Sequence, residues 1–446
     1  MRMLNAFLPA RGPVPELPFL GHALAMRADS LGFLGRLSRQ HEGLAPFRLG
    51  PARGYVLLDP DLVEEVLRSK AKRYTRQTRV YTAMARFLGQ GILITEGDEW
   101  RKHRRIVQPA FHRKRLTGYA DRMTAIAEEC VGRWEGEVNV PNAMMRMTLQ
   151  IVSETLLGIE TRDHAEAIGS AVDAAQRYAE SVIGGLVELP SVLPTARNRM
   201  LRSALETIDR IAYERIREKR ASPGNDVISM LVEATYEDGS ALPDRQIRDE
   251  LITLLAAGHE TTANALSWTL FRLGRHPLIA RRVVDEVDRV LEGRSPTLDD
   301  ISKLTYLRWV FDETLRLHPP AWTTGRLALD DHQLGPRRVE AGSLLLISPW
   351  VLQRRPELWP NPEGFDPDRW EALSAPGALH PFAFFPFGGG PRKCVGEAFA
   401  YLEAILVLAV LAQRVRLELL PGQRAEPAAQ ITLGFKHGLR ATVHPR

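Results

Sequence analysis

A lone cysteine, Cys394, follows three glycines, a proline and two cations in the stretch FFPFGGGPRKCVGEAFA, residues 384–400. Apolar residues recur after it at helical spacing, which predicts a buried helix that begins at the cysteine. The positive end of that helix, together with Arg392 and Lys393, favours a thiolate over a thiol. Lone cysteines are most often structural and buried. From this stretch alone, a structural cysteine, a nucleophile and a metal ligand all stay open.

A dinucleotide-binding turn is the alternative that the glycines suggest, because such turns place glycines between a strand and a helix. Pro381 and Pro386 interrupt the strand that this turn needs, and Pro391 lacks an N–H group for holding a phosphate. The letters GGGPRKC also differ from the pattern G-x-x-x-x-G-K followed by Ser or Thr. The sequence therefore disfavours a nucleotide site here.

A polar notch interrupts the long apolar stretch at residues 244–277, which predicts one helix. Pro243 suits the first position of this helix, and Pro277 marks its end. The notch consists of Gly258, His259, Glu260, Thr261 and Thr262. A buried carboxylate and hydroxyls need hydrogen-bond partners, and threonine hydroxyls can bond carbonyls of the preceding turn. The notch is either a satisfied internal polar cluster or a proton-handling groove beside a ligand.

Glu313 and Arg316 stand three residues apart and so share one face of a helix. The apolar residues around them leave little room for a polar face, which favours burial and requires a further partner for the guanidinium. Exposed pairs at this spacing are common, however. The local sequence alone therefore favours a surface pair.

The stretch WRKHRRIVQPAFHRKR, residues 100–115, has seven Lys or Arg residues and no acid. It is either a solvated basic face, a site for the acid groups of a ligand, or a docking surface for an acidic partner. Nucleic acid is disfavoured, because the rest of the chain shows no nucleic-acid-binding module and no sustained basic face.

The composition is that of an ordinary globular protein: 446 residues, 44% hydrophobic and 25% charged, with a net charge of +5. Two cysteines, Cys130 and Cys394, are too few for a disulfide framework and indicate a reducing compartment. The Pro-rich N-terminus and the apolar run at 404–412 are both unsuited to crossing a membrane. We therefore expect a soluble, cytoplasmic protein.

The elements that must position these residues are mainly helical, with a minor β part. Strands are expected at 45–50, 54–60 and within 327–350, a helix from Pro60, and helices over most of 115–290 with breaks at 187–198 and 221–226. The stretch 353–393 shows little periodicity, and long irregular segments inside compact domains usually have a function. We expect a single domain over 1–446, with a Pro-rich lead-in at 1–45.

The stretch around Cys394 resembles the haem loop of the cytochrome P-450 family, the haem-thiolate monooxygenases. FGGGPRKCVG matches the pattern F-x-x-G-x-R-x-C-x-G at every fixed position, namely Phe387, Gly390, Arg392, Cys394 and Gly396. The resemblance implies the fold of that family, in which a long central helix lies over a buried haem.

Further motifs of the same family follow the right order, so the resemblance covers about 46–440. AGHETT resembles the oxygen-activation motif of the central helix, and Glu313 with Arg316 matches E-x-x-R. FDPDRW resembles the meander, so that Arg369 would join that pair as a buried structural triad. Trp370 stands where the meander often has Phe, which we interpret as a packing change. WRKHR is similar to W-x-x-x-R.

The resemblance implies haem b with Cys394 as its thiolate ligand to the iron. Thr261 and Glu260 would handle protons during oxygen activation. Haem contacts would come from the loop, from the central helix and from residues that meet the propionates: Phe387, Gly396, Ala257, Gly258, Trp100, Arg104, Arg326 and Arg392.

The implied reaction inserts one oxygen atom of O2 into an apolar substrate, by hydroxylation or epoxidation of a terpenoid, fatty acid or polyketide-like compound. Substrate contacts would include Tyr81, Phe87, Leu93, Ala257, Trp322, Thr323 and Leu433, within segments such as 75–95 and 187–198. A separate ferredoxin or flavodoxin-type donor would dock on Arg101, Lys102, Arg105, Arg113 and Lys114 of a monomer. The alternatives are a peroxide-driven peroxygenase or isomerase, and a non-enzymatic haem-based binder.

Overall fold

The computed structural model describes residue 14 and residues 16–159, 162–185, 193–224 and 226–446. The chain forms two compact units, one of Met1–Arg79 with Asp312–Cys394 and one of Val80–Phe311 with Val395–Arg446. One crossing between the units falls inside helix α14 (Thr305–Leu317). The predicted single domain stays a prediction, and most of the Pro-rich start of the lead-in lies outside the described residues.

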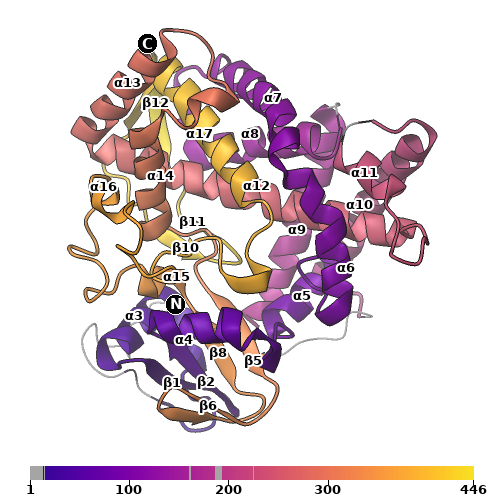
Figure 1. Ribbon diagram of the computed structural model, residues 1–446, viewed down its shortest axis with the longest axis vertical. Coiled ribbons are helices and arrows are strands. Elements are labelled where there is room, and N and C mark those ends of the chain that lie inside the picture. The colour runs from indigo at the N-terminus through magenta and orange to yellow at the C-terminus, as the bar shows by residue number, and fades with distance from the viewer. Residues whose placement is uncertain (1–13, 15, 160–161, 186–192, 225) are drawn as a thin grey trace. The chain divides into compact units, whose positions relative to one another are not determined.

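The first unit is built on a five-stranded sheet with the order β1-β2-β8-β5-β3 (Figure 1). Its strands are β1 (Leu44–Leu49), β2 (Ala52–Leu57), β3 (Tyr74–Thr75), β5 (Thr324–Ala328) and β8 (Leu344–Ile347). β2 and β8 are parallel and the other pairs are antiparallel. A separate hairpin joins β6 (His332–Leu334) to β7 (Arg337–Val339). The strands expected near 45–60 and within 327–350 are therefore present.

The first unit also contains several short helices and turns. They are α2 (Ala23–Ala28), α3 (Ser30–Gln40), α4 (Pro60–Glu64), the π-helical turn η1 (Glu65–Ser69), the 3-10 turns η2 (Ala71–Arg73) and η5 (Gly390–Arg392), α15 (Pro349–Leu352) and α16 (Arg369–Leu373). Pro60 opens α4 as predicted, and Asp59 caps the helix by accepting from the Asp61 N–H. Apolar residues of the strands, α4, η1 and α15 form a buried core with Phe382 and Phe385.

The second unit is mostly helical. Its elements are α5 (Arg79–Leu88), α6 (Gly97–Val107), η3 (Gln108–Phe111), α7 (Arg113–Val131), α8 (Val140–Thr155), α9 (Arg162–Ile183), α10 (Ala196–Ala221), α11 (Val227–Glu233), α12 (Asp244–Arg275), α13 (Pro277–Leu291), η4 (Leu298–Asp300) and α17 (Glu397–Arg414). Two small antiparallel sheets accompany them, formed by β4 (Glu137–Asn139), β12 (Arg440–Pro445) and β9 (Val415–Leu419), and by β10 (Pro427–Ala429) and β11 (Leu433–Phe435). The prediction of a mainly α fold with a minor β part is confirmed.

The long helix α12 organises the second unit and packs along α8 and α17 (Figure 1). It has 32 residues, and most of its side chains from Ile247 to Leu270 are buried. Trp268 stacks on Phe435 of β11 at 3.8 Å between ring centroids. One detail of the prediction is wrong, since Pro243 precedes the helix as its N-cap. The helix ends at Arg275, just before Pro277 as predicted, and Pro277 opens α13.

The predicted break at 187–198 is also partly wrong. Residues 187–192 lie outside the described residues, but α10 already begins at Ala196, where Thr195 caps it by accepting from the Asn198 N–H. Among the described residues, no helix combines the length and apolar character that a membrane crossing needs.

Candidate functional site

The Cys394 loop is a tight backbone turn. The Cys394 N–H donates to the Phe387 carbonyl at 3.0 Å, and the Lys393 N–H donates to the Gly390 carbonyl at 3.1 Å. Cys394 is exposed, whereas the other free cysteine, Cys130, is half-buried. The sulfur is thus available to a ligand rather than packed in a core. The following helix begins at Glu397, so the prediction that it starts at the cysteine is wrong by three residues.

Gly390 can be only glycine in this conformation. Its φ is +65°, and a Cβ atom would lie 1.9 Å from the Leu67 carbonyl oxygen of η1. Gly389 is similarly restricted, since a Cβ there would lie 2.2 Å from the Phe382 ring. The glycines of the loop therefore let it pack against η1 and Phe382, which fixes the backbone that presents Cys394.

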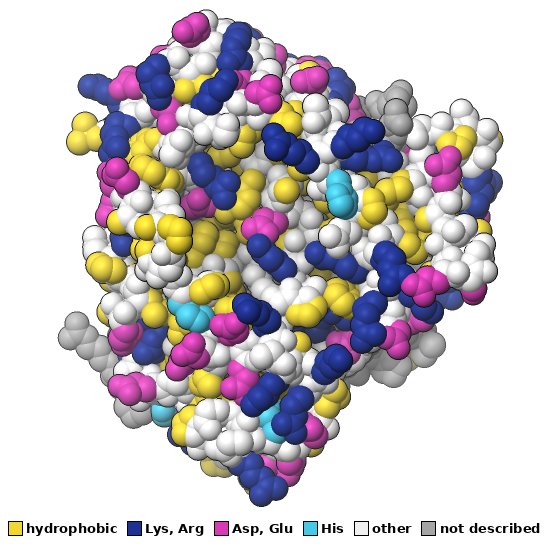
Figure 2. Space-filling view, in the orientation of Figure 1, with side chains coloured by type: hydrophobic (Ala, Val, Ile, Leu, Met, Phe, Trp, Pro, Cys, Tyr) yellow, Lys and Arg dark blue, Asp and Glu magenta, His cyan; other side chains and the backbone are white. Residues whose placement is uncertain are grey.

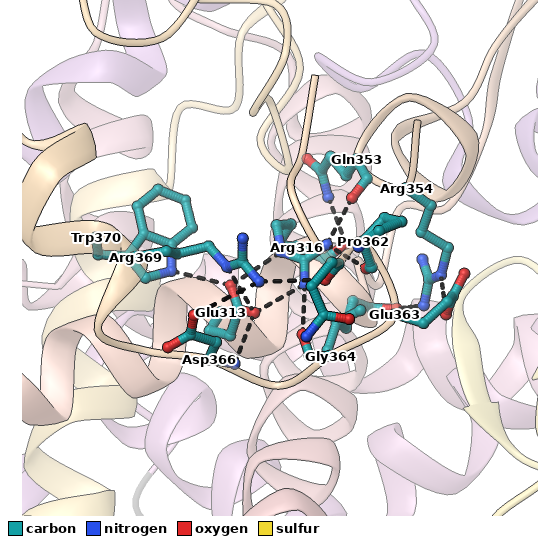
Figure 3. Close-up of polar contacts among 12 residues, drawn as sticks. Glu313, Arg316, Gln353, Arg354, Pro362, Glu363, Gly364, Asp366, Arg369 and Trp370 are labelled. Carbon is teal, nitrogen blue, oxygen red and sulfur yellow. Dashed lines mark hydrogen bonds and ion pairs between the residues drawn. The ribbon is translucent and has the colours of Figure 1, made fainter. Parts of the chain in front are cut away.

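The Glu313–Arg316 pair lies at the end of α14 with both side chains at 0% exposure (Figure 3). Arg316 Nε and Nη2 donate to the two Glu313 carboxylate oxygens at 2.9 and 2.8 Å. The guanidinium also donates to three carbonyl oxygens, those of Gln353, Pro362 and Gly364. These bonds supply the further partners that a buried guanidinium requires.

Glu313 receives donors from the irregular segment as well (Figure 3). Arg369 Nε donates to Oε1 at 3.2 Å and the Asp366 N–H to the same atom at 3.0 Å, so the expected contact of Arg369 with the pair is present. Trp370 Nε1 donates to Oε2 at 3.1 Å. The interpretation of Trp370 as a packing change is therefore wrong, because the indole adds a hydrogen bond that a phenylalanine could not make.

The polar notch of α12 is the one place where the middle of this helix is open. Ala257 is exposed and Gly258, Glu260 and Thr261 are partly exposed, while the residues on both sides are buried. Thr261 Oγ1 donates to the Ala257 carbonyl at 2.8 Å, and Thr262 Oγ1 donates to the Gly258 carbonyl at 3.1 Å. This small, smooth surface suits a flat ring.

Gly258 and His259 connect the notch to neighbouring helices. A Cβ at Gly258 would lie 3.1 Å from the Val152 side chain, so the glycine allows α8 to approach. His259 is buried, with Nδ1 2.8 Å from the Leu255 carbonyl and Nε2 3.6 Å from an Asp173 carboxylate oxygen of α9. Burial lowers the pKa of His259, but its bonds to Asp173 and Leu255 outweigh burial, so that its pKa is raised.

Glu260 is held by residues far from it in the sequence. Gln176 Nε2 of α9 donates to Oε2 at 2.7 Å, and Thr432 Oγ1 donates to Oε1 at 2.6 Å. Asn264 Nδ2 in turn donates to Thr432 Oγ1 at 2.9 Å. Burial and the nearby charge of Glu260 raise the pKa of Glu180 to about 6. No sequence motif pointed to these partners of Glu260.

Glu403 of α17 is a second residue that the sequence interpretation missed. It is fully buried, and among the described residues neither of its carboxylate oxygens has a hydrogen-bond partner. Thr262 partly offsets the effect of burial, but its hydroxyl already donates to Gly258. Burial raises the pKa of Glu403 well above its ordinary value, which favours the neutral carboxylic acid.

Glu403→Gln is therefore expected to stabilise the protein above pH 5, with a gain that grows as the pH rises. The unfolded chain releases this proton near pH 4.5, whereas the folded chain keeps it. The stability of the natural chain should thus fall by up to roughly 1 kcal/mol per pH unit between the two pKa values. Unfolding midpoints from pH 5 to 8 measure this slope. The exposed Glu418→Gln is the control, and an equal slope in the Glu403→Gln variant would contradict the prediction.

The candidate propionate contacts lie in both units. Arg326 and Arg392 belong to the first unit, where Arg326 Nη1 donates to Thr324 Oγ1 and to the Gly325 carbonyl. Trp100 and Arg104 lie on α6 of the second unit, and Arg104 Nε donates to Gln108 at 3.3 Å. Their contacts with haem stay predictions.

The candidate substrate residues are also divided. Tyr81 and Phe87 lie on α5, Leu93 in the turn after it and Leu433 on β11, all in the second unit. Trp322 and Thr323 precede β5 in the first unit. Phe87 and Leu433 are fully buried, and Leu93 is half-buried.

Several cations of the basic stretch 100–115 form ion pairs, which its sequence did not indicate. Arg101 pairs with Asp98, Lys102 with Glu99 and Arg105 with Glu237. Arg113 and Lys114 are exposed and form no ion pair with a described residue. Figure 2 likewise shows Lys and Arg interspersed with Asp and Glu on the face that it draws. Ion pairing thus reduces the positive charge of the expected docking surface.

Comparison with known proteins decides the family. The family model described as "Cytochrome P450" matches residues 11–436. The chain belongs to the cytochrome P-450 family. It is 38% identical over 428 residues to cyclooctatin synthase from Streptomyces melanosporofaciens, which covers 94% of this chain and 92% of that relative. It is 33% identical over 441 residues to pentalenene oxygenase from Streptomyces avermitilis, covering 96% of each.

A solved structure supports the same family. The crystal structure of the cytochrome P450DA heme domain superimposes with a TM-score of 0.87 at 29% identity, covering 97% of each chain. As a cytochrome P-450, this protein binds haem through a cysteine thiolate and is a monooxygenase that uses O2, an apolar substrate and electrons from a redox partner. The exposed Cys394 sulfur fits a thiolate-ligated cofactor.

Proposed function

We propose that this cytochrome P-450 hydroxylates a terpenoid, with Cys394 as the ligand to the haem iron. The observation that carries the proposal is the exposed Cys394 in a haem loop of matching sequence, in a chain 38% identical to cyclooctatin synthase. The chain is also 34% identical over 419 residues to cyclooctat-9-en-7-ol 5-monooxygenase of the same organism. Tyr81, Phe87, Leu93, Ala257, Trp322, Thr323 and Leu433 are the proposed substrate contacts.

The loop exposes Cys394, while the hydrogen bond from its N–H to the Phe387 carbonyl fixes its backbone. Arg392 beside it and the start of α17 favour the thiolate, and Phe387 packs against the cofactor. Bound haem supplies the chemistry that activates O2 with the electrons it receives. Ala257, Gly258 and Gly396 would contact the ring of the bound haem, and Trp100, Arg104, Arg326 and Arg392 would hold its propionates, since guanidinium groups match carboxylates in shape and charge.

Thr261 and Glu260 supply protons in this proposal. The Thr261 hydroxyl donates a hydrogen bond to the Ala257 carbonyl. Rotation of the side chain would point the same hydroxyl proton toward a reacting oxygen. Gln176 and Thr432 each donate to one oxygen of Glu260, which holds the carboxylate in place and leaves each oxygen a further lone pair for water or a protonated partner.

We also propose that a ferredoxin or flavodoxin-type protein delivers the electrons to a cytoplasmic monomer. Arg113 and Lys114 are its principal contacts, because Arg101, Lys102 and Arg105 already have carboxylate partners. The cytoplasmic location rests on cysteine usage, since two free cysteines suit a reducing compartment.

The test is reconstitution of the purified holoprotein with NADPH, a ferredoxin and its reductase, using cyclooctat-9-en-7-ol and pentalenene as probes. We expect a spin shift on binding and an alcohol product labelled from ¹⁸O2. Thr261→Ala should keep the thiolate haem but release most electrons as hydrogen peroxide. Turnover with hydrogen peroxide alone at the same rate would favour a peroxygenase, and absence of any spin shift across a terpenoid library would contradict the substrate class.

A further inference from the structure

The turn between α5 and α6 is held by four nearly consecutive residues of α12. Arg248 Nη1 donates to the Phe87 carbonyl at 2.9 Å. The Gln90 N–H donates to Asp249 at 2.8 Å, and the Ile92 N–H donates to Glu250 at 3.0 Å. Gln246 Nε2 donates to the Gln90 carbonyl at 3.1 Å. Side chains of one helix therefore satisfy the backbone of a connection that has no regular structure of its own.

The charged groups that do this are buried. Asp249 and Glu250 are 3% and 1% exposed. Asp249 has Arg248 Nη1 at 2.9 Å as a partner, and Arg248 Nε also donates to Asp209 at 2.8 Å. Glu250 has His103 Nδ1 of α6 at 2.9 Å. Buried carboxylates are costly unless they are paired and fully bonded, and here much of that bonding goes to the turn.

The glycines of the turn give a second, independent sign of the same close approach. Gly89 has a φ of +64°, and a Cβ there would lie 2.2 Å from Asp249 Oδ2. A Cβ at Gly91 would lie 2.1 Å from Thr253 Oγ1 and 2.7 Å from the Asp249 carbonyl. The turn lies against α12 with no room for a side chain at Gly89 or Gly91. Both the hydrogen bonds and the close packing therefore fix the backbone of the turn.

We infer that Gln246, Arg248, Asp249 and Glu250, with His103 as the partner of Glu250, form a clamp that sets substrate selectivity by fixing the turn at residues 87–95. The inference rests on the proposed function in one respect, that Phe87 and Leu93 contact the substrate. The Phe87 carbonyl accepts a hydrogen bond from Arg248, and Leu93 directly follows Ile92, whose N–H donates to Glu250. Movement of the turn would therefore move both side chains. The clamp residues are positioning residues: they act through Phe87 and Leu93.

Asp249→Ala is the most direct test, because Arg248 keeps Asp209 as a partner and no buried charge is left alone. We expect amide exchange at residues 88–95 of the holoprotein to quicken by about tenfold or more, since the Gln90 N–H loses its acceptor. Asp249→Asn, which keeps an acceptor oxygen, should restore most of the protection. Asp244→Ala is the matched control, because Asp244 begins the same helix but is exposed and pairs with Arg220.

A binding measurement separates selectivity from stability. Imidazole and the bulkier 4-phenylimidazole bind haem iron directly, so their optical titration needs no knowledge of the substrate. In Asp249→Ala we expect the ratio of the two dissociation constants to change by about fivefold, with an unchanged CO band, which loss of stability alone would not produce. The Asp244→Ala ratio should stay at the natural value. Glu250→Gln provides the same readouts if Asp249→Ala does not fold.

The outcomes distinguish the clamp from the proposed terpenoid activity. An altered azole ratio without any terpenoid spin shift would support the clamp and contradict the substrate class. Terpenoid binding together with unchanged exchange and an unchanged azole ratio in Asp249→Ala would overturn the clamp. Faster exchange with an unchanged ratio would overturn it too, because the turn would then be mobile without affecting selectivity.

Discussion

Replacing Cys394 with alanine is expected to abolish the red-shifted Soret band of the reduced, CO-treated protein and all O2-dependent turnover. The loop offers no second sulfur: the other cysteine, Cys130, lies on α7 with its Sγ 3.6 Å from Gln150 Oε1. Alanine leaves the backbone bond from residue 394 to the Phe387 carbonyl intact, so the loop should keep its shape. The effect is therefore on the ligand and not on the fold.

Cys130→Ala is the matched control and should retain both the band and turnover. Haem content, measured separately, shows whether the Cys394→Ala variant still binds the cofactor without its thiolate. Survival of the red-shifted band in that variant would mean that another residue ligates the iron, and the assignment of Cys394 would fall.

Those parts of the site whose residues are close together in the chain could be predicted from the sequence. The Cys394 loop and the α12 notch are each one continuous stretch of sequence, so the spacing of their residues along the chain largely determines how the residues are arranged in space. Local patterns were less reliable where burial decides the outcome. The apolar neighbours of Glu313 and Arg316 suggested burial, but their spacing favoured a surface pair until the family resemblance reversed that preference. The structure shows why, since the irregular segment 353–370 covers them with carbonyl and N–H groups.

The remaining partners are long-range contacts that no periodicity predicts. Gln176 and Thr432 meet at Glu260 although 256 residues separate them in the chain (432 − 176), and Glu237 reaches Arg105 from another part of it. Glu403 is one of two acids in the largely apolar helix α17, and the sequence gives no sign that it is the fully buried one. The α12 clamp was also unforeseen, because it joins side chains of α12 to backbone N–H and carbonyl groups of a distant turn.

Glu313→Ala is expected to have the largest effect on stability of any single substitution in the first unit. It removes the acceptor of Arg316, Arg369, Trp370 and the Asp366 N–H at once. The buried Arg316 charge is then left without its carboxylate, a loss that costs about 3–5 kcal/mol. Because natural proteins are stable by only about 5–15 kcal/mol, we expect little folded holoprotein to accumulate at 37 °C.

The measurement is the denaturant midpoint of the purified holoprotein, or the yield of haem-bound protein where purification fails. Glu363→Gln is the matched control: Glu363 also pairs with an arginine, Arg354, but its side chain is 73% exposed, so we expect a change below about 0.5 kcal/mol. Equal midpoints for Glu313→Ala and Glu363→Gln would show that the cluster is not a stability element.

Two further variants separate the parts of the Glu313 effect. Trp370→Phe removes one donor while keeping an aromatic ring, and should cost about 1 kcal/mol. Glu313→Leu with Arg316→Met removes both charges, a change that is often neutral for an isolated buried pair. Here it should stay destabilising, because Arg316 also donates to the carbonyls of Gln353, Pro362 and Gly364, which would be left buried and unpaired. An unchanged denaturant midpoint in the double variant would mean that the two residues only compensate each other's charge and that their other hydrogen bonds do not add to stability.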